Sequence, residues 1–589
     1  MKRAQDQQLQ HLGQFFHLFR VSRGLTLQQA AGELSAASVS RFERGESDLA
    51  SDKAVVLMRR LGIENVDFLR YYEHNPGNFP LGLELLIQYH DVPAITRRQT
   101  EYFRVHHRDH AMSALAAILF EAAAHWPDPQ YHLSADAEQQ VADRLADMTQ
   151  YGVFEVELVK AIIAPASHEL LVLLNDRAQS LDQRWATIKA VWQLLLWLGA
   201  LMNHDLALAD QLQLALTLAF AHYDKYSTLA EYWPNWAFGQ KLRDYVHQPT
   251  PAHATAIQQL ITDLDVMGVH EDARWYQKIF AHAKTGQVHH SETLIARKFS
   301  MPVVTSLGAL IQQRRLYLGM QREDLDAYGS VSALRRFEND QTQLSFATLT
   351  QVMGQLALLP SQALTLINRD ADHPNGMRNL RATFLQIALH PEIASQAITH
   401  FQLENAQQPS SILAKQLFVL RTKAHLSQSG DVELAQEILA ELLRTNTWYT
   451  LEMYLVQALA EWLPASQLAT LFQHGHRILT KSPLIGNGNQ YFLGLNAAIA
   501  RVVAQADPMV AQPWLAQFKW LPTMNSVHPA RWLAAGSWYT ARYLIETTAT
   551  NQAALQLYLA RSQRVGHLAI PNLLAQTWQG QVAGDFFEF

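Results

Sequence analysis

Residues Leu12–Leu49 have the sequence LGQFFHLFRVSRGLTLQQAAGELSAASVSRFERGESDL, in which apolar side chains recur at spacings of three and four. This spacing is typical of amphipathic helices. Thr26 and Ser35 each precede such a segment, where a hydroxyl can cap a helix by accepting from the free amides of its first turn. In the segment after Ser35, Val39 and Phe42 lie three apart and face inward, which leaves small and basic residues on the exposed sides. We therefore predict that residues 8–70 divide into five short helical units.

A second copy of this stretch begins 295 residues later. Residues Leu307–Leu344 have the sequence LGALIQQRRLYLGMQREDLDAYGSVSALRRFENDQTQL, which aligns with the first stretch without a gap. More faintly, YGVFEVEL from Tyr151 resembles WYTLEMYL from Trp448. A match at a fixed offset indicates an internal repeat, so we predict a tandem duplication with about 290 residues in each copy. The nine identical pairs of the main alignment are Leu12 and Leu307, Gly13 and Gly308, Arg20 and Arg315, Gly24 and Gly319, Ser35 and Ser330, Arg41 and Arg336, Phe42 and Phe337, Glu43 and Glu338, and Leu49 and Leu344.

The composition bounds the class of protein. The chain has 589 residues, which is more than one core of about 250 to 300 residues can hold. Apolar residues make up 49%, which excludes a disordered chain. The net charge of −6 excludes a polycation that coats nucleic acid without specificity, so any contact with DNA must be local. There is no cysteine, which excludes disulfides, thiolate zinc sites and cysteine nucleophiles.

Neither a signal peptide nor a membrane span is predicted. The first residues are polar where a signal peptide would be apolar. The longest apolar run, Ala190–Met202, is interrupted by Gln193 and is shorter than the roughly 20 residues that span a bilayer. We expect a cytoplasmic protein that makes no contact with a membrane.

The rest of the chain also has helical spacing, and alternating strand patterns are scarce. The predicted fold class is therefore all-α, with two copies of a small bundle followed by a helical-hairpin, TPR-like repeat domain. The resemblance described below implies that each bundle is a helix-turn-helix bundle. The predicted domains are a helix-turn-helix domain at 1–70, a helical repeat domain at 71–285, a linker at 286–302, a second, degenerate helix-turn-helix domain at 303–370 and a second helical repeat domain at 371–589.

The segment after Ser35 has the features of a helix that enters a major groove. Small residues at its start allow close approach, while serine and arginine supply donors for phosphates and base edges. The candidate DNA-binding residues are Thr26, Gln28, Ala37, Ser38, Ser40, Arg41 and Arg44 in the first copy and Ser332, Arg335 and Arg336 in the second.

The segment resembles a helix-turn-helix of the Cro and phage-repressor type. That resemblance implies an ion pair between an arginine late in the first helix, four residues before a glycine, and the glutamate that ends the recognition helix. Arg20 and Glu43 occupy these positions in the first copy, and Arg315 and Glu338 occupy them in the second. The pairs are expected to be structural, since removing one partner would leave a partly buried charge unpaired.

The longer string SRFERGESDLASDKAVVLMRRLGI resembles the Rgg, MutR and GadR type of transcription regulators from Gram-positive bacteria. This resemblance implies a helix-turn-helix joined to a helical repeat domain, a homodimer and a short peptide pheromone as effector. The helical remainder matches only by its length and helicity, so no ligand-binding residue can be assigned.

The second copy departs from the motif. FERGES becomes FENDQT, which replaces Arg44 by Asn339 and Gly45 by Asp340. Its basic and acidic residues balance, whereas the first copy has a basic surplus, so we expect stronger phosphate contact from the first copy. Whether the second copy binds DNA stays open at this stage. The residues that contribute to the surplus include Lys2, Arg3, Arg23, Arg41, Arg44, Lys53, Arg59 and Arg60.

Two functions remain in view. The first is a sequence-specific DNA-binding transcription regulator in which the fused copies act as a covalent pseudo-dimer, controlled by a small peptide bound in the helical domains. Its partners would be double-stranded DNA, the peptide, RNA polymerase and a further copy of the chain. The alternative is a helical-repeat scaffold that binds peptides or proteins and whose head domains no longer bind DNA.

Other motifs favour ordinary structural roles. His106 and His110 lie one helical turn apart but have no acidic third ligand at motif spacing, and HELLV at His168 lacks the second histidine of a zinc protease. GNGN at Gly486 is better explained by a turn than by a phosphate loop. We therefore expect no enzyme, no cofactor and no metal. Polar residues in apolar helices that would need a partner if buried are Asn175, Asn203 and Asn496.

Overall fold

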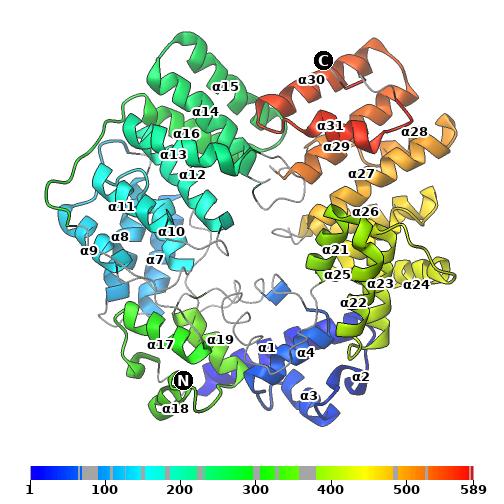
Figure 1. Ribbon diagram of the computed structural model, residues 1–589, viewed down its shortest axis with the longest axis horizontal. Coiled ribbons are helices and arrows are strands. Elements are labelled where there is room, and N and C mark those ends of the chain that lie inside the picture. The colour runs from blue at the N-terminus through cyan, green and yellow to red at the C-terminus, as the bar shows by residue number, and fades with distance from the viewer. Residues whose placement is uncertain are drawn as a thin grey trace. The chain divides into compact units, whose positions relative to one another are not determined.

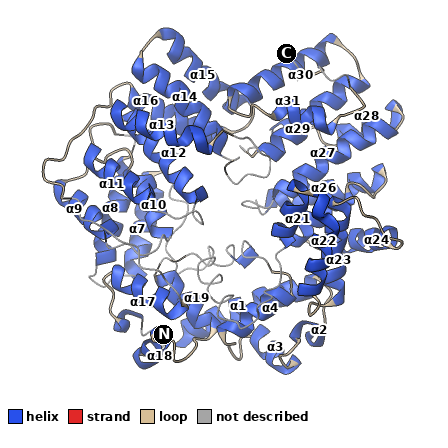
Figure 2. Cartoon of the chain, viewed as in Figure 1, coloured by secondary structure: helices blue, strands red, loops and turns tan. Residues whose placement is uncertain are grey.

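The computed structural model describes residues 2–63, 67–68, 91–105, 111–126, 128–146, 153–179, 186–221, 229, 232–295, 306–325, 330–356, 358, 380–481, 488–523, 528–582 and 586–587. Within these ranges there are 28 α-helices and no strands, and the β pairing consists of two isolated bridges (Figure 2). The prediction of an all-α fold is confirmed. No helix in the described ranges is long and apolar enough to cross a membrane.

The chain forms two compact units, and each unit takes segments from both halves of the sequence. Unit 1 comprises Met1–Phe79 and Pro302–Leu495, and unit 2 comprises Pro80–Met301 and Asn496–Phe589. The two aligned stretches, residues 12–49 and 307–344, therefore both lie in unit 1.

The first head, residues 1–70, contains four described helices: α1 (Lys2–Ser22), α2 (Leu27–Ala31), α3 (Ala36–Glu43) and α4 (Ser51–Arg60) (Figure 1). Thr26 forms a capping box with Gln29 at the start of α2, and the Ser35 hydroxyl accepts from the Ser38 amide at the start of α3. Both predicted caps are therefore present. Val39 and Phe42 are fully buried, as their spacing predicts.

The second head, residues 303–370, repeats this arrangement with one change. Its described elements are α17 (Leu307–Tyr317), the 3₁₀ helix η3 (Arg322–Leu325), α18 (Val331–Glu338) and α19 (Phe346–Gln355). Ser330 caps α18 by accepting from Ala333, as Ser35 caps α3. The element that corresponds to α2 is the 3₁₀ turn η3, at whose start the Gln321 amide donates to Asp324.

After the second head along the chain, unit 1 continues as a stack of helices with an apolar core. Fully buried aromatic side chains in this stack include Phe418, Trp448 and Tyr491. The helices are α21 (Leu380–Leu389), η4 (Pro391–Ile393), α22 (Ala394–Glu404), α23 (Ser410–Lys423), α24 (Asp431–Arg444), α25 (Thr450–Leu459), α26 (Ala465–Lys481) and the first part of α27 (Gly488–Gln505).

Unit 2 is also a stack of helices, and it joins the first half of the chain to the C-terminal segment. Asp263 of α15 accepts from Arg564 of α30 at 2.6 Å. The helices from the first half are α7 (Val92–Val105), α8 (Ala111–His125), α9 (Ala135–Ala146), α10 (Val153–Ile162), α11 (His168–Gln179), α12 (Ala186–Met202), α13 (Leu206–Ala219), α14 (Trp233–His247), α15 (Pro251–Val266) and α16 (His270–Ala283). The C-terminal elements are the end of α27, α28 (Pro508–Ala516), η5 (Leu521–Thr523), α29 (Pro529–Ile545), α30 (Ala549–Arg564) and α31 (Ile570–Thr577).

The described part of the predicted linker, residues 286–295, lies against helices of unit 2. The His168 amide donates to the His289 carbonyl at 2.8 Å, and the Ser291 amide donates to Glu169 at 2.7 Å. The imidazole rings of His132 and His289 stack with centroids 4.5 Å apart. We call residues 284–295 the strap.

Candidate nucleic-acid interface

An arginine and a glutamate lock helix one to helix three in the first head. Arg20 Nε donates to Glu43 Oε1 at 2.6 Å, and Arg20 Nη2 donates to Oε2 at 2.7 Å. Arg20 Nη1 donates to the Leu25 carbonyl at 2.8 Å. Because Glu43 is buried, this bidentate pair fixes the end of α3 against α1.

The second head has the same lock at the offset of 295. Arg315 Nε and Nη2 donate to Glu338 at 2.7 and 3.0 Å, and Nη1 donates to the Met320 carbonyl at 2.8 Å. The third partner of the carboxylate differs between the heads. It is His17 Nδ1 at 2.9 Å in the first head and Arg322 Nε at 2.7 Å in the second.

A glycine permits the close crossing of helices in each head. A Cβ atom built on Gly13 would lie 2.2 Å from the Phe42 carbonyl oxygen, and one built on Gly308 would lie 2.3 Å from the Phe337 carbonyl oxygen. Both distances are shorter than any real contact. Gly13 and Gly308, which are aligned, thus share one steric reason, which is the approach of helix one to the backbone of helix three.

The candidate DNA-binding residues are at least partly open to solvent. The α3 helix buries Val39, Phe42 and Glu43 and leaves its opposite side uncovered. Exposed candidates in the first head are Thr26, Gln28, Ala37, Arg41 and Arg44, and half-buried ones are Ser38 and Ser40. In the second head Ser332, Arg335 and Arg336 are all exposed.

The surfaces that carry the candidate DNA-binding residues differ in charge between the two heads. Arg44 forms a bidentate pair with Glu46 at 2.6 and 2.8 Å and also contacts the Ser40 hydroxyl. This hydrogen-bonded pair lowers the pKa of Glu46. The aligned residues of the second head are the uncharged Asn339 and Gln341.

At the position of Ser40 the second head has Arg335. Asp340, in place of the glycine, adopts the left-handed backbone with φ of 56° and accepts from the Ser306 hydroxyl at 2.7 Å. The substitution that makes the second copy depart from the motif is therefore accommodated without loss of the turn.

The two heads contact each other through segments that correspond in the alignment (Figure 1). Ala50 forms an antiparallel bridge with Ser345, which is the residue 295 positions later. The Ser51 amide donates to the Leu344 carbonyl at 3.3 Å, and the Phe346 amide donates to the Leu49 carbonyl at 2.7 Å. Exchanging the two copies converts one of these bonds into the other. Such reciprocity is the contact pattern of a two-fold interface.

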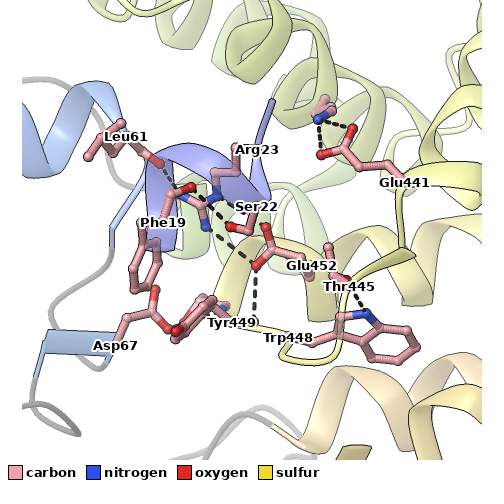
Figure 3. Close-up of polar contacts among 12 residues, drawn as sticks. Phe19, Ser22, Arg23, Leu61, Asp67, Glu441, Thr445, Trp448, Tyr449 and Glu452 are labelled. Atoms are coloured by element: carbon pink, nitrogen blue, oxygen red, sulfur yellow. Dashed lines mark hydrogen bonds and ion pairs between the residues drawn. The ribbon is translucent and has the colours of Figure 1, made fainter. Parts of the chain in front are cut away.

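Two arginines of the expected basic surplus have internal roles instead. Arg23 is 3% exposed and pairs with Glu452 of α25 (Figure 3). Arg60 donates to the carbonyl groups of Ala30, Gln29 and Gln407. Both residues count toward the basic surplus of the sequence, but their donors are used within the first head and to join it to the helical stack of unit 1. No local sequence signal marks these long-range partners.

Unit 2 contains an open groove of about 380 Å³, a candidate ligand site. Its lining combines the small residues Ala497, Ala500 and Ala504 of α27 with polar residues. Asn496 lies at one end and donates to the Thr577 hydroxyl at 3.1 Å. The lining residues are Asn496, Ala497, Ala500, Arg501, Ala504, Gln505, Thr577 and Gln581.

The other singled-out residues have structural partners where they are described. Asn175 accepts from Gln193 at 3.4 Å, and Asn203 donates to the Ala164 carbonyl at 2.9 Å. His168 contacts Asp205 at 2.5 Å. His106, His110 and Gly486 lie outside the described residues. Among the residues that are described, no group of three histidine or acidic side chains is arranged to hold a metal ion.

No family model and no curated protein matches the chain. Solved structures of PrgX are similar to it. The PrgX/cCF10 complex matches with a TM-score of 0.32 and 14% identity, over 47% of this chain and 99% of that one. The PrgX/iCF10 complex matches with the same score and identity, over 46% of this chain and 96% of that one. A structure described as a bacterial peptide pheromone/receptor complex matches with a TM-score of 0.31 and 13% identity, over 46% and 96%.

Proposed function

We propose that the chain is a sequence-specific DNA-binding transcription regulator in which two fused heads act as a covalent pseudo-dimer. The observation that carries this proposal is the reciprocal pairing of Ala50 with Ser345, together with the two equivalent locks. Proteins with this helix-turn-helix bind two half-sites as two-fold dimers. In this proposal the duplicated chain supplies both heads, so no second subunit is needed.

The proposed operator is asymmetric, because the two recognition helices offer different donors. The first head offers Ser40 and Arg41, whereas the second offers Arg335 and Arg336. Arginine is the residue that most often forms a bidentate contact with guanine, and serine is less selective. We therefore expect a guanine requirement in the second half-site that has no counterpart in the first.

A short peptide bound in the helical domains is proposed to control the heads. The groove of unit 2 suits an extended peptide, because the alanines of its lining leave space and its polar side chains can bond to a peptide backbone. Such a peptide regulates only if it binds two arrangements of the protein with different affinity. Titration of candidate peptides against the parent and an Ala500→Trp variant would test this part, since the larger side chain fills the groove.

Selection of duplexes from a random library, followed by footprinting of the purified chain, tests the proposed DNA binding. We expect two protected half-sites, affinity that falls steeply with salt, and loss of base preference in one half-site for Arg41→Ala and in the other for Arg336→Ala. Protection of a single half-site would make the second head structural. If no duplex is preferred at any salt concentration, the helical-scaffold alternative is correct.

A further inference from the structure

The side chain of Arg23 lies in a buried joint between the first head and helix α25 (Figure 3). Its Nε and Nη2 atoms donate to the two oxygens of Glu452 at 3.1 and 3.4 Å. Its Nη1 atom donates to the Leu61 carbonyl, and its guanidinium lies 5.0 Å from the centre of the Phe19 ring. The side chains of Arg23 and Glu452 are 1% and 9% exposed, so this ion pair is shielded from solvent.

The first head also caps α25. Asp67 accepts from the amide of Thr450 at 3.0 Å and from its hydroxyl at 2.8 Å. Glu452 accepts from the Tyr449 amide at 3.0 Å, and the rings of Phe19 and Tyr449 have centroids 3.8 Å apart. The free amides at a helix start need acceptors, and here a carboxylate of the head supplies one of them.

The joint leaves little free space. A cavity of about 10 Å³, which is the size of a single water, lies between Ser22, Thr445 and Glu452. Beside it Lys415 pairs with Glu441 at 2.5 Å. Because the side chains of Arg23 and Glu452 are both buried, a head that moved away from α25 would leave two buried charges unpaired.

Comparison of the two heads separates the two contacts of Arg23. In the second head Arg314 Nε donates at 2.8 Å to the carbonyl of Leu356, which is the residue aligned with Leu61. Arg314 aligns with Phe19, however, and the residue aligned with Arg23 is the buried Leu318. Arg23 and Arg314 thus occupy positions one helical turn apart in the alignment, and they donate to the aligned carbonyls of Leu61 and Leu356. The carbonyl contact thus does not account for an arginine at position 23, whereas Glu452 does.

We propose that Arg23 and Glu452 are positioning residues. They fix the first head on the helical stack of unit 1, so that the start of α25 sets the orientation of α3. This inference rests on the proposed function for its consequence, since it gives one half-site a fixed distance and angle from the other. Its structural part is independent of DNA. The pair is a route by which movement of the helical domain reaches one head.

The absence of cysteine makes a direct distance measurement possible. Spin labels on cysteines introduced at the exposed Gln14 of α1 and Glu437 of α24 report the position of the head on the helical domain by double electron–electron resonance. We expect one narrow distance distribution for the labelled parent and a broadened or shifted one for Glu452→Gln and for Arg23→Leu. Glu46→Gln and Arg44→Leu, which change an exposed pair on the same head, are the matched controls and should leave the distribution unchanged.

The double variant Phe19→Arg with Arg23→Leu copies the second head. It keeps an arginine for the Leu61 carbonyl while it removes the contacts with Glu452 and Tyr449, so the head should stay folded by circular dichroism and the distribution should still broaden. An unchanged narrow distribution in this variant and in Glu452→Gln would overturn the proposal.

The DNA measurement is separate. Duplexes selected by the parent are lengthened by one base pair between the half-sites. This insertion should weaken binding of the parent by a factor that is about fivefold or more larger than the factor for Glu452→Gln. Unaltered spacing discrimination would overturn the positioning role. If the parent selects no duplex, the proposed function fails while the distance measurement still decides the joint.

Discussion

Arg20 and Arg41 lie on the same head and have different predicted roles. The Arg20 side chain is 11% exposed and bonded to Glu43, which is 4% exposed, whereas Arg41 is exposed. Arg20→Ala should lower the free energy of unfolding by about 3 kcal/mol, because it leaves a buried carboxylate without its main partner. Denaturation in urea, followed by circular dichroism, measures this loss.

Arg41→Ala should change the free energy of unfolding by less than about 0.5 kcal/mol, since nothing buried depends on it. It should instead weaken specific DNA binding by about 1 to 3 kcal/mol in a fluorescence-anisotropy titration. Equal losses of stability in the two variants would contradict these roles.

Gly13→Ala should destabilise the first head. The added Cβ would meet the Phe42 carbonyl oxygen at 2.2 Å, and backbone on both sides leaves the clash no flexible neighbour to move. Overpacking of this kind costs about 1 to 3 kcal/mol, which thermal melting can detect. Gln14→Ala, at the next and exposed position, is the control, and an equally small shift for both would refute the steric reason.

At the residue scale the sequence predicts local partners and misses distant ones. The caps at Thr26 and Ser35 follow from spacing alone, since donor and acceptor lie within one turn. Arg23 and Glu452 are 429 positions apart, and nothing near either residue indicates the other. From the composition alone Arg23 is counted among the charged surface residues, but in the structure its side chain is buried.

At the element scale, His282 makes the stability of unit 2 depend on pH. Helix α16 places its ring with Nε2 against the Asn203 side-chain oxygen at 3.0 Å. Burial lowers the pKa of His282 to about 4, and the neighbouring His132 and His204 add to this while Asp128 opposes it. As the pH falls, His282 becomes protonated near pH 6.5 in the unfolded chain but only near pH 4 in the folded chain.

The contribution of neutral His282 to the free energy of unfolding is therefore fully present above pH 6.5, and it declines as the pH falls toward 4. From pH 7 to 4.5 this single group should cost about 2 kcal/mol. His282→Gln, which can still donate to Asn203, should have a shallower decline of the melting temperature over that interval. Identical pH dependence in parent and variant would show that other groups account for the decline.

The kinds of elements were predictable, but their details were not. Apolar spacing correctly predicts helices throughout the described ranges, because burial of one face is a local property of the sequence. At Arg322–Leu325 a 3₁₀ turn stands in place of an α-helix, and there the Arg322 side chain donates to Glu338, a tertiary contact that local spacing does not predict. The contacts of the strap likewise depend on helices far from it in the sequence.

At the scale of the whole molecule, each unit requires both halves of the chain. Unit 1 includes the pairing of Ala50 with Ser345, and unit 2 includes that of Asp263 with Arg564. Residues 1–295 and 306–589 expressed together as two polypeptides should therefore form a stable one-to-one complex. Co-purification through a tag on one piece and size-exclusion chromatography measure this, and separate elution of two folded pieces would contradict it.

The similarity between residues 12–49 and 307–344 is visible in the sequence, and it indicates which segments are alike. It does not indicate which segments pack together, because an alignment shows which residues correspond and contains no information about which residues are in contact. That the first head packs on α25, for example, is visible only in the fold. The groove on α27 was likewise unpredictable, since its alanines are common in any helix.

The bridge between Ala50 and Ser345 has a consequence for how this protein can change over time. In an assembly of two identical chains, the residue on the axis faces its own copy, and every substitution arises on both sides at once. Here alanine already faces serine, so the two sides vary one at a time. In the proposed regulator, one head can therefore acquire a new target sequence while the other keeps its old one, and the covalent link keeps the two heads together on dilution.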